Sequence, residues 1–159
     1  MGTLYQYYPN KQALLFAVVE RHVGEVGSHV EQAAESVHGK SLPEIVSTIV
    51  NAFVMAKIER LDEARALYAV AGELDSRSLA TETEKRALAI LSAALRTAKD
   101  VQFSDLPTAA YMFLAAMVGP TTYMIENGAP ASIVRAWSGQ LASLCLGYLE
   151  RVAHSTGEG

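Results

Sequence analysis

Residues 2–14 read GTLYQYYPNKQAL, and this stretch sets where the first long helix of the chain begins. The helix is expected to open at Asn10-Lys11, directly after Pro9. Across residues 15–37, apolar side chains then recur every three to four positions and form one stripe. This spacing predicts a long amphipathic helix.

The same helical spacing continues through the rest of the chain, and no segment combines strict alternation with β-branched enrichment as a strand would. Residues 74–78 read as a connection. Further helices are expected to begin at residues 41–44, near 61, at or just before 81–84, at 104–107 and at 130–132. The sequence therefore predicts an all-α fold, a bundle of about six helices.

The most apolar segment, residues 109–124, is broken by Gly119-Pro120, which is expected to kink or interrupt its helix. We interpret the segment as buried helix and not as a membrane span. Residues 1–11 lack the apolar stretch of a signal peptide, and the single cysteine, Cys145, forms no internal disulfide. These features favour a cytoplasmic protein.

The charge of the chain limits what it can bind by itself. Its 159 residues carry a formal net charge of −4, and half of them are hydrophobic. A self-sufficient DNA-binding protein needs a basic surface that neutralises phosphates. Any contact with nucleic acid is therefore expected from a small local patch.

Residues 2–14 are similar to the signature of TetR-family regulators at the end of their recognition helix. In that family a Gly-Thr-Leu-Tyr run lies on this helix, an aromatic pair and a short Asn-Lys turn follow, and an Ala-Leu step opens a long linker helix. The resemblance implies that Thr3 and Tyr5 lie at the DNA-facing helix. It also implies that Tyr7 and Lys11 contact phosphates, which contributes affinity and not sequence readout. The alternative is that two of the tyrosines only pack the turn.

The resemblance also divides the chain. Residues 1–10 would be the remnant of a helix-turn-helix DNA-binding domain, 11–154 the linker helix with the effector-binding and dimerisation domain, and 155–159 a polar tail. The family's first two helices are not in this sequence, so Met1 is interpreted as a misplaced start or a truncation. DNA would be bound only through the complete N-terminal domain, by a homodimeric repressor that responds to a ligand.

Aromatic and thioether side chains lie on the helices that line the central pocket in this family. Such a pocket suits a small lipophilic or aromatic effector, although ordinary core packing is the alternative for each residue. In the family's mechanism the effector moves the linker helix, and Gly24 and Gly27 are interpreted as its flex points. The candidate effector-binding residues are Phe53, Tyr68, Tyr111, Met112, Met117 and Tyr123.

The final helix has large apolar residues on one row and small residues on another at a spacing of four. Two apolar helices per chain would pair with those of a second copy in a four-helix bundle with two-fold symmetry. The competing interpretation is a monomer whose last helix is buried. The candidate dimer-interface residues are Trp137, Gly139, Leu141, Ser143, Leu144, Gly147 and Tyr148.

Enzyme chemistry and cofactors are not predicted, because no phosphate-binding loop, nucleophile elbow or fixed acid–base pair is visible. His22, Glu25 and His29 share one side of the first helix, but a boundary stripe is favoured over a metal site. The rival function is a stand-alone helical ligand-binding or adaptor module without DNA activity. An enzyme built on a helical bundle is a distant third.

Overall fold

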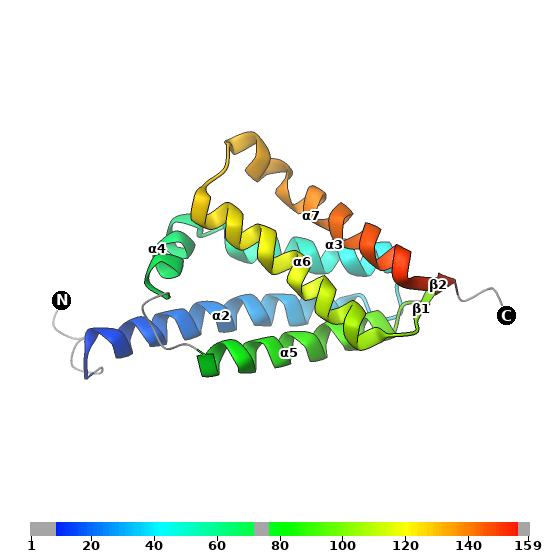
Figure 1. The fold of residues 1–159 in the computed structure, drawn as a ribbon, viewed down its shortest axis with the longest axis horizontal. Coiled ribbons are helices and arrows are strands. Elements are labelled where there is room, and N and C mark those ends of the chain that lie inside the picture. The colour runs from blue at the N-terminus through cyan, green and yellow to red at the C-terminus, as the bar shows by residue number, and fades with distance from the viewer. Residues whose placement is uncertain (1–8, 72–76, 156–159) are drawn as a thin grey trace.

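The computed structural model describes residues 9–71 and 77–155, and nearly all of this part is helical (Figure 1). The expected all-α fold is confirmed. The helices are α2 (Lys11–Ser36), α3 (Leu42–Ile58), α4 (Leu61–Ala71), α5 (Arg77–Arg96), α6 (Leu106–Asn127) and α7 (Ala131–Val152).

Helix α2 begins where the sequence predicts. The side-chain oxygen of Asn10 accepts a hydrogen bond of 2.8 Å from the backbone amide of Ala13, so Asn10 is the N-cap. The helix continues through Gly24 and Gly27 and ends at Ser36. It is the longest helix among the described residues.

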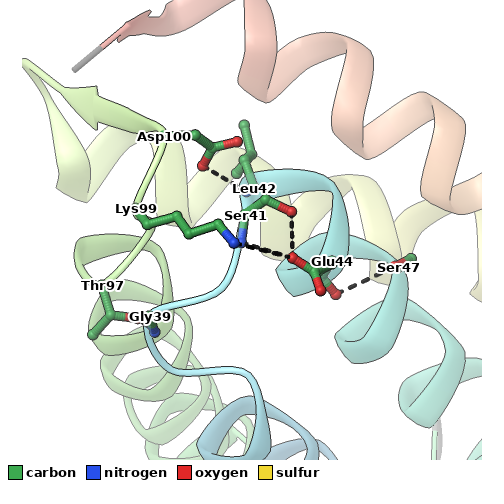
Figure 2. Close-up of polar contacts among 8 residues, drawn as sticks. All are labelled: Gly39, Ser41, Leu42, Glu44, Ser47, Thr97, Lys99 and Asp100. Atoms are coloured by element: carbon green, nitrogen blue, oxygen red, sulfur yellow. Dashed lines mark hydrogen bonds and ion pairs between the residues drawn. The ribbon is translucent and has the colours of Figure 1, made fainter. Parts of the chain in front are cut away.

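Helix α3 starts with a capping box. The backbone amide and the hydroxyl of Ser41 both donate to Oε2 of Glu44, at 3.1 and 2.6 Å. These bonds lower the pKa of Glu44, the hydroxyl more than the amide, because they favour the ionised carboxylate. Figure 2 shows this start beside the end of α5, where the Lys99 ammonium lies 4.0 Å from the same oxygen. The Ser41-Leu42-Pro43-Glu44 signal is thus a true helix start.

One boundary differs from the sequence predictions. Helix α5 begins at Arg77, so residues 77–78 are helical and not part of a connection, and residues 81–84 lie in its early turns. For α6 the sequence predicts a kink or an interruption at Pro120, and the interruption does not occur, because the helix runs through Pro120 to Asn127. Proline removes only one backbone donor there, and contacts with α5, α7 and α4 hold α6 on several sides.

Two short strands were not predicted. β1 (Val101–Phe103) and β2 (Ala153–Ser155) pair antiparallel, with Gln102 opposite His154. Three residues are too few to show alternation, and the partners lie far apart in the sequence. Ser155, assigned from sequence to the polar tail, pairs with Val101. The ladder joins the end of α7 to the connection between α5 and α6.

Helix α3 is the centre of the bundle. It packs against α2 and against α7, while α5 lies beside α2 and also contacts α6 (Figure 1). The α3 side chains Ile45, Ile49 and Val50 are completely buried. The main core includes α2 only from Val26 onward. A smaller buried cluster joins α4 to the C-terminal end of α6.

Candidate functional site

An apolar cavity of about 380 Å³ lies between α2, α5 and α6. Helix α2 contributes Val19 and Val23, and α6 contributes Leu114, Ala115 and Val118. Val19 is buried, but it is not part of the main core. The N-terminal half of α2 therefore faces this cavity, while its C-terminal half packs into the core.

The first turns of α5 form the third wall. Leu79, Ala80, Thr83, Glu84 and Ala87 line it, at the spacing of one helical face. Two of these residues are alanines, whose short side chains leave space between the helices. Thr83 and Glu84 bring a hydroxyl and a carboxylate to an otherwise apolar wall.

The predicted effector-binding residues whose side chains the structure describes do not lie together. Of these five, only Tyr111 lines the cavity. Phe53 and Met117 are buried in the main core, where they fill space between helices. Met112 and Tyr123 are exposed on α6. The side chain of Tyr68 lies outside the described part of the chain.

Most of the cavity wall consists of valine, leucine and alanine, and not of the aromatic and sulfur-containing residues that were predicted to line it. No composition rule separates these aliphatic residues from core residues. Val19 and Val23 do lie on the predicted stripe of α2. The helical period identifies the inward face of a helix, but it does not tell which part of that face borders a space.

Exposed apolar side chains gather on the last two helices. Among the described residues, seven large hydrophobic side chains are exposed, and six of them lie on α6 or α7. On α7 these are Ile133 and Leu144, and Leu144 has 54% of its surface exposed. Two of the six, Tyr111 and Val118, also line the cavity, so Met112, Tyr123, Ile133 and Leu144 are the exposed apolar side chains of α6 and α7 outside it.

The predicted interface residues of α7 divide into two groups. Gly139, Ser143, Leu144 and Gly147 are exposed, whereas Trp137 and Tyr148 are half-buried. A Cβ atom added at Gly139 or Gly147 would meet nothing within 4 Å, so packing inside the protomer does not require glycine there.

Trp137 and Tyr148, the two largest side chains of that set, are half-buried within the protomer, and Leu141 is buried. The indole Nε1 of Trp137 donates a hydrogen bond of 3.2 Å to Oγ1 of Thr121 on α6. Leu141 is only 3% exposed and belongs to the main core. The face available to a partner is therefore the row of small residues together with Leu144.

The predicted DNA-contacting residues lie at the start of the chain. Lys11 is exposed as the first residue of α2. Thr3, Tyr5 and Tyr7 lie outside the described residues.

Polar side chains are buried where α2 meets α3 and α4. His22 is buried, and its Nε2 has no hydrogen-bond partner among the described residues. Burial lowers the pKa of His22, and the charge of Lys57 lowers it further. Lys57 is itself buried, with its ammonium 5.9 Å from the ring centre of Phe53.

The side chains of His22, Glu25 and His29 are not arranged as the ligands of one metal ion. Nδ1 of His29 lies 2.8 Å from the backbone oxygen of Glu25, which turns this ring toward its own helix. Within residues 9–71 and 77–155, no three His, Cys, Asp or Glu side chains are grouped as metal ligands. The Cys145 thiol is buried in α7, which raises its pKa to about 11.

A protein-family model matches most of the chain. A family model described as "Tetracyclin repressor-like, C-terminal domain" matches residues 41–149, the segment from the N-cap of α3 almost to the end of α7. No individual curated protein matches the chain. In the described part, none of the helices has the length and apolar character needed to cross a membrane.

Proposed function

The chain belongs to the tetracycline repressor-like family through its C-terminal domain, and from this premise we propose that it is the ligand-sensing and dimerising part of a transcriptional regulator. The observation that carries the proposal is the apolar cavity whose wall includes the N-terminal half of α2. Its volume of about 380 Å³ lies within the range typical of small-molecule sites. The ligand class proposed is a small lipophilic or aromatic effector.

The position of the cavity supports a route from ligand to DNA. Val19 lies eight residues after Lys11, about 12 Å along the helix. A ligand that contacts Val19 and Val23 therefore touches the helix that leads directly to residues 2–14. The ligand shifts the equilibrium between two positions of α2 only if it binds the protein more tightly in one position than in the other.

In the proposed mechanism, the position of α2 sets the spacing of two recognition elements in a homodimer. Helix-turn-helix dimers bind half-sites about one DNA turn apart, so a change of spacing lowers DNA affinity. Thr3, Tyr5, Tyr7 and Lys11 are proposed to make the positioning contacts with DNA. Loss of binding on ligand entry corresponds to relief of repression.

The proposed homodimer uses the outer faces of α6 and α7. The exposed apolar side chains of these helices, and glycines whose Cβ positions are open, allow two helix pairs to approach closely. Two such pairs form a four-helix interface with two-fold symmetry.

The cavity is tested with Nile red, a neutral lipophilic dye whose fluorescence rises in apolar surroundings. The variant Ala80→Trp places a large side chain in the α5 wall, where the native alanine is exposed at the surface. Dye affinity is expected to fall at least about tenfold, which corresponds to about 1.4 kcal/mol of binding free energy. Ala93→Trp is the matched control, because Ala93 is exposed on α5 and is not part of the wall.

Equal dye affinity in the wild type and Ala80→Trp would contradict the cavity as the binding site. A ligand that occupies it should also raise the melting temperature of the wild type and not of Ala80→Trp, since it stabilises only the folded state that binds it.

A further inference from the structure

The charge of the cavity wall points to the class of ligand that it selects. Glu84 is the one acidic side chain among the described wall residues, and the other polar groups, on Thr83 and Tyr111, are neutral hydroxyls. None of these wall residues is a lysine, arginine or histidine. The described wall therefore has a net negative charge and an apolar interior.

The basic side chains nearest to Glu84 in the sequence do not neutralise it. Arg86 forms an ion pair with Glu31 of α2. Lys85 is exposed and is not part of the cavity wall. No ion pair involves Glu84 within the described parts of the chain. Its carboxylate is thus available to a bound molecule.

Glu84 is exposed, so water reaches its carboxylate and its attraction for a cation is that of an exposed ion pair. The apolar wall binds the body of the ligand, and the carboxylate adds a preference for one sign of charge. The electron-rich ring of Tyr111 adds a second group in the same wall that favours a cation. A lipophilic anion would instead be placed beside Glu84 with no compensating positive group in the described wall.

We propose that the cavity between α2, α5 and α6 selects lipophilic cations, with Glu84 as the residue that determines charge specificity. This inference rests on the proposed function, because it assigns the ligand class of the same cavity. The ligand would carry a delocalised or shielded positive charge on an apolar body, which enters the cavity while the charge lies against the α5 wall.

Two ions of nearly identical shape test the proposal. Tetraphenylphosphonium and tetraphenylborate carry opposite charges on the same arrangement of four phenyl rings, and each is titrated calorimetrically into the full chain. Tetraphenylphosphonium is expected to bind about fivefold more tightly, a ratio at the upper end of the range for an exposed ion pair. Glu84→Gln should remove most of this preference, because it removes the negative charge and keeps the length of the side chain.

Glu82→Gln is the matched control, because it makes the same change of net charge on the same helix. Glu82 is exposed and is not in the cavity wall, so this variant should keep the preference. A loss of preference in both variants would assign it to the overall charge of the protein and would overturn the role of Glu84.

The remaining outcomes separate this inference from the proposed function. If Nile red binds and is displaced equally by both ions, the cavity is a ligand site without charge selectivity, and only the cation inference is wrong. If neither ion nor Nile red binds the wild type, the cavity is not a ligand site and both proposals are overturned.

Discussion

The carboxylate of Asp100 accepts a hydrogen bond of 2.8 Å from the backbone amide of Leu42, although 58 residues separate them (Figure 2). Leu42 is the first residue of α3, where backbone amides have no partner within the helix. A negative charge at this end also interacts favourably with the helix dipole. The turn between α5 and β1 thus completes the cap of the central helix.

Replacing this carboxylate is expected to destabilise the bundle. Asp100→Ala leaves the amide of Leu42, a nearly fully buried residue, without its acceptor, which costs about 1–3 kcal/mol. Urea unfolding followed by circular dichroism measures the change. Asp62→Ala is the control, since its fully exposed carboxylate reaches Arg65 only at 4.0 Å. Equal stability of Asp100→Ala and the wild type would show that this cap contributes nothing.

His22 is expected to make the folded state sensitive to acid. Burial and, secondly, the charge of Lys57 lower its pKa from the ordinary 6.5, while Glu25 and Glu63 partly oppose this and Arg60 adds to it. The unfolded chain therefore takes up a proton more readily than the folded one. The contribution of His22 to stability is complete above pH 6.5 and is lost as the pH falls below it.

The sign of this dependence can be measured by chemical unfolding between pH 7.5 and 5. His22→Leu is expected to lose less stability over this range than the wild type, because the uncharged side chain has no proton to bind. His29→Leu replaces an exposed histidine on the same helix and should retain the wild-type dependence. A variant without His22 that is as acid-sensitive as the wild type would exclude His22 as the cause.

Leu144→Arg is expected to convert the proposed dimer to a monomer. The side chain is 54% exposed on α7, so an arginine there leaves the protomer intact but places charge in the interface. Analytical ultracentrifugation should give twice the chain mass of 17.1 kDa for the wild type and the single mass for the variant. Met55→Arg, at an exposed apolar residue of α3, should remain dimeric. A wild type of single mass would refute this interface.

Gly24→Ala and Gly27→Ala together are expected to stabilise α2. An added Cβ meets nothing within 4 Å at either position, and alanine favours a helix by about 1 kcal/mol over glycine at each. Thermal unfolding measures the gain. If these glycines are the flex points of the linker helix, the double variant made in a protein with the complete N-terminal domain should keep its ligand affinity, while the response of DNA binding to ligand changes. An unchanged response would remove that role.

Local signals in the sequence predicted the helices, and packing decided the rest. Asn10, Ser41 and Asp105 each form their cap with residues three positions later, so sequence spacing is sufficient to find them. The pairing of β1 with β2 joins segments about fifty residues apart and left no local pattern. The cavity forms where the faces of three helices meet, and this arrangement depends on packing between distant segments. Residue type alone therefore did not separate Phe53 and Met117, which lie in the main core, from residues of the cavity wall.

The main core includes α2 only from Val26 onward. If a ligand displaced the part of the helix that precedes Val26, that part would pivot about this residue. Val19 lies seven residues before this point and Lys11 fifteen. For a rigid helix, a sideways push at Val19 is therefore magnified about twofold at Lys11, because displacement grows with distance from the pivot. A ligand that moves the cavity wall by a fraction of an ångström would therefore produce a larger displacement at the N-terminal end of α2.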